Sequence, residues 1–180
     1  MKNIVLCGFM GAGKTAVGSA LAKMLGRPFV DTDSVIEAEE GITVSEIFRR
    51  LGERRFRKTE AKVVKALSGT GGLVISAGGG ALLDKKNAAN LARNGVIVRL
   101  DASPDAIARR IGKAGTRPLL AGKHGELKAR ISDMLEKRRK SYSIADFAVD
   151  TTHLDAATAA KAVAAVVAGG ARKGKTPNSI

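Results

Sequence analysis

"GFMGAGKT", residues 8–15, follows the short apolar run "IVLC" and leads into "AVGSALAKML". The spacing Gly8-x-x-x-x-Gly13-Lys14-Thr15 matches the phosphate-binding loop pattern, which requires a strand before it and a helix after it. Glycines let main-chain N–H groups approach phosphate oxygens closely, and the positive end of the following helix dipole favours the same anion. The stretch therefore predicts nucleotide binding; the alternative, a chance glycine-rich turn, does not explain its context.

The lysine and the threonine of this loop have separate expected roles. Lys14 can reach the β- and γ-phosphates of a nucleotide, and the Thr15 hydroxyl can contribute an oxygen to Mg²⁺. The loop does not identify the acceptor of the phosphate, which the rest of the chain has to indicate.

The composition of the 180-residue chain is that of a globular domain, with 44% hydrophobic and 27% charged residues. No stretch approaches the roughly 20 apolar residues of a membrane-spanning helix, and the first residues lead directly into a predicted strand, so we expect no membrane span and no signal peptide. The single cysteine, Cys7, lies in an apolar run and suits a reducing cytosol. We expect a cytoplasmic monomer with one domain over residues 1–170.

The formal net charge of +14 has three interpretations: a nucleic-acid surface, attraction of an anionic substrate and ATP, or solvated lysines on helix faces. Lysines and arginines are spread along the whole chain, and aromatic residues that could stack on bases make up only 3% of it. We therefore expect no nucleic-acid partner.

Apolar runs alternate with helical patterns along the chain. Strands are expected at 3–9, 28–33, 72–78, 95–101 and 146–151, and helices at 15–25, 45–67, 84–94, 103–111, about 125–141 and 154–169. This alternation predicts an α/β fold, a three-layer P-loop NTPase fold with a central five-stranded parallel sheet. Residues 112–126 contain four glycines and no clear period, which indicates a mobile lid, and residues 171–180 are expected to be a disordered tail.

Two carboxylates, Asp31 and Asp33 of "DTD", end the second predicted strand. Ligands of open parallel sheets bind beyond the carboxyl ends of strands, and alternate residues of a strand point the same way, so we expect both carboxylates in one site. One can hold Mg²⁺ through water, and the other can orient a substrate hydroxyl or take its proton. The alternatives are solvated turn carboxylates, or a cap for a helix over "SVIEAEE" with Asp33 or Ser34 as the capping residue.

Cationic side chains gather in "GERRFRKTE", residues 52–60, and in "KRRKSY", residues 137–142. An arginine fork suits a carboxylate because it makes two parallel charge-assisted hydrogen bonds. Exposed arginines on helices are usually solvated, however, and spacing alone does not say which cation of the first group faces a site. Its candidates are Arg54, Arg55, Arg57 and Lys58.

Two further motifs suggest close contact with a ligand. "SAGGGA", residues 76–81, follows the third predicted strand, and its three glycines indicate either close approach to a ligand or a tight connection without one. Arg117, in "TRPLL" of the predicted lid, is placed to neutralise charge while a γ-phosphoryl group transfers.

In this order, "GFMGAGKT", "FVDTD", "IFRRLGERRFRKTE", "ISAGGGA", "RPLLAG" and the Arg-x-x-x-Tyr of "RRKSY" resemble the shikimate kinase family over roughly residues 1–152. Members of that family are P-loop kinases with a nucleoside-monophosphate-kinase-like fold. The resemblance implies ATP-dependent phosphorylation of the 3-hydroxyl of shikimate, which yields shikimate 3-phosphate and ADP on the route to chorismate and the aromatic amino acids.

The resemblance also implies roles for particular residues. Shikimate and MgATP would be the ligands, and Lys14, Asp33 and Arg117 the catalytic residues. The ATP site would comprise Gly11, Ala12, Gly13, Lys14, Thr15, Ala16, Arg110 and Arg117, with Thr15 on Mg²⁺ and Asp31 in its water shell. The shikimate site would comprise Asp33, which binds hydroxyls and acts as or near the base, with Arg57, Gly79 and Arg138. The walls would be Val44, Phe48, Phe56, Pro118 and Leu119, for which core packing is an equal interpretation.

Two alternatives stay open. Many family members carry Pro-Leu before the tyrosine, where this chain has Lys140 and Ser141, and either Arg138 or Arg139 could reach the substrate carboxylate; the spacing favours Arg138. A gluconate kinase or a nucleoside monophosphate kinase is the nearest rival function, and a basic nucleotide-binding protein that binds nucleic acid is a rival of another class.

Overall fold

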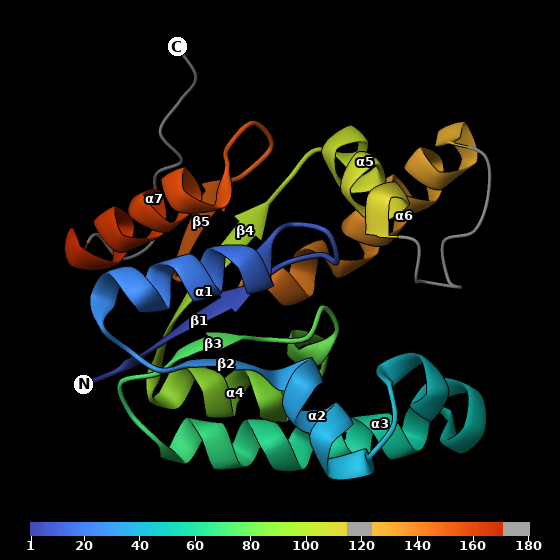
Figure 1. Cartoon of the computed structure of the whole chain (residues 1–180), viewed down its shortest axis with the longest axis horizontal. Coiled ribbons are helices and arrows are strands. Elements are labelled where there is room, and N and C mark those ends of the chain that lie inside the picture. The colour runs from blue at the N-terminus through green and yellow to red at the C-terminus, as the bar shows by residue number, and fades with distance from the viewer. Residues whose placement is uncertain (115–123, 171–180) are drawn as a thin grey trace.

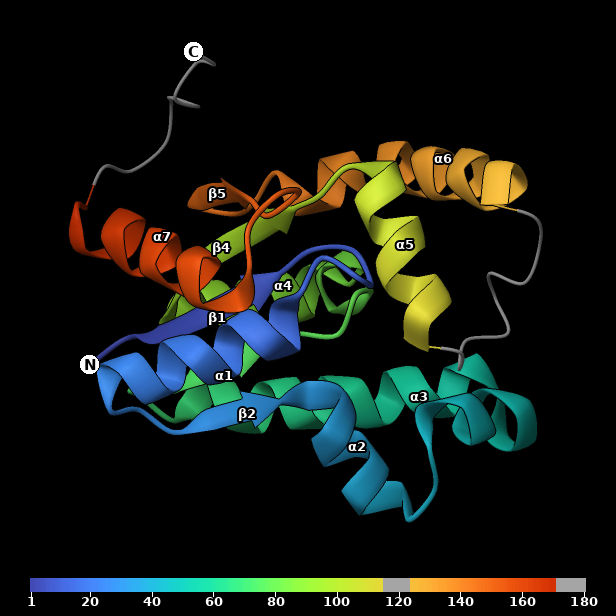
Figure 2. The same cartoon turned by 45° about the horizontal axis from the view of Figure 1, so that its top comes forward.

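The computed structural model of the chain describes residues 1–114 and 124–170. Figures 1 and 2 show a sheet between two layers of helices, which confirms the predicted three-layer α/β fold. Arg117, Pro118, Leu119 and the tail at 171–180 lie outside the described residues.

Within the described residues, five parallel strands form the central sheet. They are β1 (Asn3–Cys7), β2 (Phe29–Asp31), β3 (Val74–Ser76), β4 (Gly95–Asp101) and β5 (Phe147–Asp150). Their order is β2-β3-β1-β4-β5, so β1 lies in the middle and β2 and β5 lie at the edges. Because all strands are parallel, their carboxyl ends meet at one edge of the sheet, and the glycine-rich loop follows β1 at that edge.

The helices connect these strands and cover both faces of the sheet (Figure 2). They are α1 (Lys14–Leu25), α2 (Thr32–Glu40), α3 (Val44–Gly69), α4 (Lys85–Arg93), α5 (Pro104–Ala114), α6 (His124–Tyr142) and α7 (Ala156–Ala168), with a 3₁₀ turn, η1 (Ala81–Leu83). In the described ranges each of them is too short or too polar to traverse a bilayer.

The central strand explains how the two helical layers are held. β1 is buried along its whole length, and its side chains alternate between the faces of the sheet. Ile4 and Leu6 pack with α1 and α7, whereas Val5 and Cys7 pack with α3, α4 and the end of α6. Burial of the Cys7 thiol raises its pKa to about 12, so this cysteine is an inert part of the core.

Helices α5 and α6 form a separate pair beyond the carboxyl edge of the sheet. Their contact is an apolar cluster that contains Ile107, Leu127 and Ile131 together with Phe9 of the glycine-rich loop. The loop is therefore packed directly against the helices that flank the predicted lid. Both helices extend into the predicted lid at 112–126, because α5 continues to Ala114 and α6 begins at His124.

The second strand is shorter than predicted, and a helix replaces its end. β2 stops at Asp31, whose carboxylate accepts a hydrogen bond from the backbone N–H of Asp33 at 3.0 Å and so caps α2. The prediction that Asp31 and Asp33 lie on one strand and share a face is wrong. Asp31 is the capping residue of the helix over "SVIEAEE", a role that the sequence had suggested for Asp33 or Ser34.

We predict that Gly8 cannot be replaced without a large loss of stability. Its φ is +136°, and a Cβ atom there would collide with the carbonyl oxygen of Leu100 in β4, so Gly8→Ala combines backbone strain with a steric clash. We expect the free energy of unfolding in urea to fall by about 3 kcal/mol.

Gly26→Ala is the matched control for this substitution. Gly26 also has a positive φ, of +62°, but a Cβ atom there would meet nothing within 4 Å. Its loss should be limited to about 1 kcal/mol of backbone strain. Equal losses in the two variants would contradict the clash at Leu100.

Candidate functional site

The glycine-rich loop leads into a helix whose first turn lacks a side-chain cap. Gly13 occupies the N-cap of α1 with φ of +95°, no side chain caps it among the described residues, and the first turn contains no acidic residue. The backbone N–H groups of Lys14, Thr15 and Ala16 therefore lie at the positive end of the α1 dipole, next to Gly11 and Ala12. Such an end attracts an anion, and a phosphate group fits the requirement.

Lys14 folds back over this loop. Its Nζ atom lies 3.0 Å from the carbonyl oxygen of Gly8 and 3.1 Å from that of Phe9. The ammonium group is thus held beside the same first turn of α1 and adds positive charge to it.

Two oxygen atoms suited to Mg²⁺ meet beside the loop. The Thr15 hydroxyl donates a hydrogen bond of 2.7 Å to Oδ2 of Asp31, so the start of α1 and the end of β2 are joined at this point. Mg²⁺ prefers oxygen ligands, and it is commonly held by one or two protein groups together with water and phosphate oxygens. The donor set of Thr15 and Asp31 fits that ion.

The triple-glycine turn, residues 78–80, is the place where the charged side chains of the site converge. A Cβ atom at Gly78 would lie 2.6 Å from Oδ1 of Asp33, and one at Gly80 would lie 2.8 Å from both terminal nitrogens of Arg57. A Cβ atom at Gly79 would lie 3.7 Å from a terminal nitrogen of Arg138 and 3.5 Å from the backbone nitrogen of Met10. The turn therefore contacts the acid, both arginines and the phosphate-binding loop.

Thr32 fixes this turn relative to α2. Its buried hydroxyl accepts a hydrogen bond of 2.8 Å from the backbone N–H of Gly78. Because Thr32 lies between Asp31 and Asp33, this bond sets the position of both carboxylates. Asp31 reaches Thr15, whereas Asp33 faces Gly78, so the two carboxylates lie in one region although the strand geometry expected for them is absent.

The structure separates Arg57 from the other cations of its stretch. Arg57 is half-buried, and its guanidinium donates hydrogen bonds to Oε2 of Glu60 at 2.8 Å and Oε1 of Glu53 at 3.2 Å. Although burial favours its neutral form, these carboxylates raise the pKa of Arg57, which therefore stays charged. Arg55 instead pairs with Glu40 on α2 at 3.0 Å. Arg54 and Lys58 are exposed.

Glu60 is a site residue for which the sequence predicted no role. Its side chain is 1% exposed, and its Oε1 atom has no hydrogen-bond partner among the described residues. Burial raises the pKa of Glu60; Arg57 opposes this shift, and the charges of Asp33 and Asp84 add to it. The available signal was its spacing, because a residue three positions after Arg57 shares its helix face.

Arg138 and Tyr142, one helical turn apart on α6, both contact the triple-glycine turn. A terminal nitrogen of Arg138 and the hydroxyl of Tyr142 donate hydrogen bonds to the carbonyl oxygen of Gly79, at 3.0 Å and 2.7 Å. The Arg138 guanidinium also lies over the ring of Phe9, 5.2 Å from its centroid. Arg139 is 79% exposed and pairs with Glu136, so only Arg138 of this pair faces the turn.

Arg110 connects α5 to the phosphate-binding loop. It donates hydrogen bonds to the carbonyl oxygens of Thr151 and Gly11, at 2.6 Å and 3.3 Å. The buried Thr151 hydroxyl lies 3.0 Å from the carbonyl oxygen of Ala12 and 2.9 Å from that of Asp101. The sequence did not single out Thr151, because a threonine at the end of an edge strand carries no distinctive pattern.

The expected wall residues lie between α2 and α3. The rings of Phe48 and Phe56 contact each other in a tilted arrangement, with centroids 4.8 Å apart and an angle of 36° between their planes. Phe56 belongs to a buried cluster with Ile36 and Ile47, and Val44 packs against that cluster. These contacts correspond to the core-packing interpretation of the three side chains.

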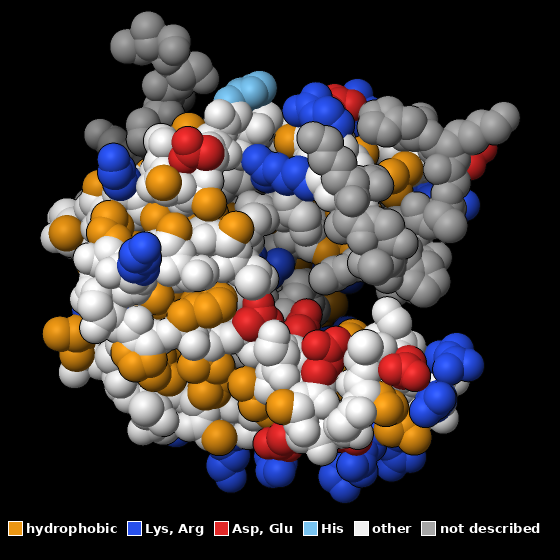
Figure 3. Space-filling view, in the orientation of Figure 1, with side chains coloured by type: hydrophobic (Ala, Val, Ile, Leu, Met, Phe, Trp, Pro, Cys, Tyr) orange, Lys and Arg blue, Asp and Glu red, His pale blue; other side chains and the backbone are white. Residues whose placement is uncertain are grey.

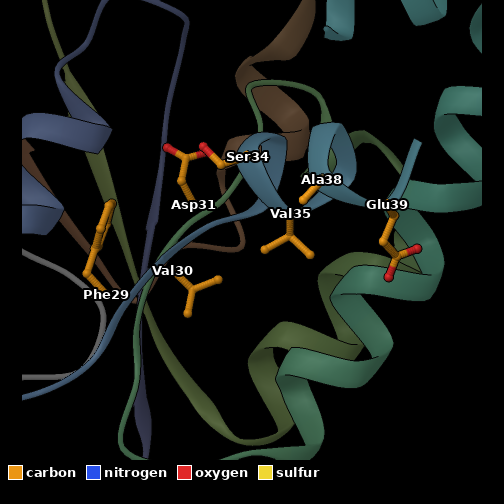
Figure 4. Close-up of a pocket in the computed structure, with 7 residues that line it drawn as sticks. All are labelled: Phe29, Val30, Asp31, Ser34, Val35, Ala38 and Glu39. Carbon is orange, nitrogen blue, oxygen red and sulfur yellow. The ribbon is translucent and has the colours of Figure 1, made fainter. Parts of the chain in front are cut away.

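A hollow of about 600 Å³ lies along the edge strand β2 and shares Asp31 with this site (Figure 4). Figure 4 shows Asp31 and Ser34 pointing to one side of the chain and Val30 and Val35 to the other. Because its lining contains neither Asp33 nor an arginine, this hollow does not provide the acceptor chemistry expected from the sequence. On the face of the molecule seen in Figure 1, acidic side chains gather at the middle and basic side chains lie along α3 (Figure 3).

Comparison with known proteins identifies the family. The sequence model of the family described as shikimate kinase matches residues 10–168. The chain belongs to the shikimate kinase family. It is 49% identical over 151 residues to the shikimate kinase of Pelotomaculum thermopropionicum, a match that covers 84% of this chain and 87% of that protein. It is 47% identical over 151 residues to the shikimate kinase of Desulforudis audaxviator, with 84% and 78% covered.

Solved structures agree with this assignment to the shikimate kinase family. The chain superposes on the Acinetobacter baumannii shikimate kinase in complex with shikimate with a TM-score of 0.87, at 34% identity, covering 94% of each chain. A gluconokinase from Sinorhizobium meliloti superposes with a TM-score of 0.57 at 23% identity, covering 93% of this chain and 94% of that one, which shows a shared fold alone. The gluconate kinase alternative is therefore less supported.

We predict that Glu60 makes the fold less stable as the pH rises. Its pKa is higher in the folded chain than in the unfolded chain, so its contribution to stability is fully present below the unfolded pKa of 4.5 and is lost as the pH rises through the folded value. We therefore expect the free energy of unfolding of the native chain to fall, relative to that of the Glu60→Gln variant, as the pH rises from 4.5 to 8.

Glu53→Gln is the control, because it removes the other carboxylate on Arg57 from an exposed position. We expect a smaller change with pH in that variant, measured by urea unfolding at each pH. A shift in favour of the native chain at pH 8 would show that the ion pair with Arg57 outweighs the cost of burying Glu60.

Proposed function

We propose that this chain transfers the γ-phosphoryl group of ATP to the 3-hydroxyl of shikimate and releases shikimate 3-phosphate and ADP. The observation that carries the proposal is the convergence of Asp33, Arg57 and Arg138 on the triple-glycine turn, directly beside the phosphate-binding loop. Shikimate is a small carboxylic acid with several hydroxyl groups. It requires guanidinium groups for its carboxylate and an acid for its hydroxyls, and this turn gathers both.

The acceptor would be held at two ends. Arg57 and Arg138 bind its carboxylate, and the backbone of Gly79 supports the ring between them. Asp33, in the first turn of α2, accepts a hydrogen bond from the reacting hydroxyl and receives its proton as the oxygen attacks phosphorus. The carboxylate also orients the nucleophile, and orientation together with proton removal is what a positioned general base contributes to the rate.

The nucleotide would be held by the opposite side of the site. The backbone of residues 11–16 would bind the phosphates, and Lys14 would contact the β- and γ-phosphates. Thr15 would hold Mg²⁺, and Asp31 would hold it through water. When bound, Mg²⁺ neutralises charge on the phosphates. Arg110 would lie along the nucleotide. The expected role of Arg117, which lies outside the described residues, would be to neutralise charge on the transferring group.

We also propose that residues 1–170 form one domain, with the lid at about 112–126, and that the protein acts as a monomer in the cytoplasm without a nucleic-acid or membrane partner. The support for one domain is that the described strands form a single sheet and that the described helices connect these strands or follow the last of them. The support for the cytoplasm is that Cys7 is the single cysteine, so the chain contains no internal disulfide.

The test is release of ADP with MgATP and one acceptor at a time: shikimate, gluconate or a nucleoside monophosphate. We expect shikimate alone to raise the rate above the ATPase background, and the Lys14→Ala variant to show none of this increase. Turnover with gluconate and not with shikimate would refute the proposal. So would tight binding of duplex DNA without any shikimate-dependent release of ADP.

We predict that Arg57→Ala separates the two substrates. Charge-assisted hydrogen bonds contribute about 1.5–3 kcal/mol, so the KM for shikimate should rise about 10- to 150-fold, while the KM for ATP stays within about threefold. Arg54→Ala, an exposed arginine three residues earlier, should leave both values unchanged. Equal losses for shikimate and ATP in the Arg57 variant would show that Arg57 does not bind the acceptor.

A further inference from the structure

Tyr142 has no catalytic or binding role in the proposed function, although its hydroxyl reaches the centre of the site. It is the last residue of α6, it is buried, and it belongs to the apolar cluster that also contains Ala77 and Ala81, the residues before and after the triple-glycine turn. Its hydroxyl donates a hydrogen bond of 2.7 Å to the carbonyl oxygen of Gly79. Packing alone would be satisfied by phenylalanine, so the hydroxyl calls for a separate explanation.

The same carbonyl oxygen also accepts a hydrogen bond from Arg138, at 3.0 Å. A carbonyl oxygen has two lone pairs, so both bonds can form together. Residues four apart on a helix lie on one face, and Tyr142 and Arg138 therefore reach Gly79 from the same side of α6. The phenol and the guanidinium group thus share one anchor on the turn.

We propose that Tyr142 is a positioning residue for the acceptor: its hydroxyl holds the Gly79 carbonyl so that Arg138 can turn toward the acceptor carboxylate without leaving that oxygen unpaired. The proposal rests on the proposed function, in which Arg138 binds this carboxylate. Without the phenol, a bond from Arg138 to the acceptor would compete with its bond to Gly79, and an unpaired carbonyl oxygen carries a desolvation cost. With the phenol in place, the Gly79 peptide keeps its orientation in both states.

The surroundings of Tyr142 keep its hydroxyl a donor at neutral pH. Burial raises the pKa of this phenol above its usual value of 10; the charge of Arg138 and a hydrogen bond with its side chain oppose the shift without cancelling it. The proton therefore stays on the oxygen, where the bond to the Gly79 carbonyl requires it.

The composition of the chain makes this contact directly observable. Tyr142 is the single tyrosine, and there is no tryptophan, so the near-ultraviolet emission of the protein comes from this side chain. The phenol keeps its bond to Gly79 in both states, but the charge of Arg138 acts on it. Movement of Arg138 toward the acceptor should therefore alter that emission.

The first test is Tyr142→Phe in the full chain, which keeps the ring and removes only the oxygen. We expect the KM for shikimate to rise about 5- to 10-fold, with kcat within about threefold and the KM for ATP within about twofold. Val64→Ala, in the same apolar cluster, is the control for a purely structural effect; it should lower stability and leave the KM for shikimate unchanged. An unchanged KM for shikimate in Tyr142→Phe would overturn the proposal.

The second test uses the native chain and does not depend on folding of a variant. Shikimate should change the tyrosine emission with the same midpoint as its binding, and ADP alone should not. If shikimate is phosphorylated but leaves the emission unchanged, the proposal for Tyr142 fails while the proposed function stands. If shikimate is not phosphorylated at all, the proposed function itself fails.

Discussion

The site depends on one steric constraint, the absence of side chains at Gly78 and Gly80. Asp33 of α2 and Arg57 of α3 lie 2.6 Å and 2.8 Å from where Cβ atoms of these residues would stand, whereas a Cβ atom at Gly79 would make only an ordinary contact of 3.7 Å with Arg138 of α6. The turn lies at the carboxyl end of β3, next to the phosphate-binding loop that follows β1. Helices α2 and α3, and α6 far from them in the sequence, can therefore bring charged groups to one point because the glycine backbone there leaves room for them.

The Arg57–Glu60 pair beside the triple-glycine turn favours ligand binding and lowers the folding stability. Glu60 is buried with one oxygen unpaired among the described residues, and its partner Arg57 is only half-buried. A buried ion pair of this kind seldom stabilises a fold, but it holds the guanidinium in one orientation. We interpret the pair as a means to keep Arg57 directed at Gly80, where the acceptor carboxylate is expected. Local instability of this kind is common where a fold also has to bind a ligand.

The sequence by itself determined the architecture and the nucleotide side of the site. Strand-like and helical patterns alternate with clear periods, so the parallel sheet and the position of β4 followed from local preferences and burial alone. The phosphate-binding loop was equally readable, because its chemistry is performed by consecutive backbone N–H groups and needs no distant partner. Local patterns did not predict where β2 ends. The stretch "FVDTD" has a strand pattern, but the Asp31 side chain caps α2 and the helix begins there.

Only the tertiary structure decided which side chains face the triple-glycine turn, where we propose that the acceptor binds. Four cations follow one another in "GERRFRKTE", and nothing local distinguishes Arg57, which faces the turn, from Arg55, which pairs with Glu40 on α2. The same holds for Arg138 against Arg139, and for Tyr142, whose partner Gly79 lies 63 residues earlier. Glu60 pairs locally with Arg57, but the charges of Asp33 and Asp84 that act on it come from other parts of the chain. A sequence states which residues can share a helix face, whereas the orientation of that face depends on how α2, α3 and α6 pack around the sheet, and packing is a property of the whole fold.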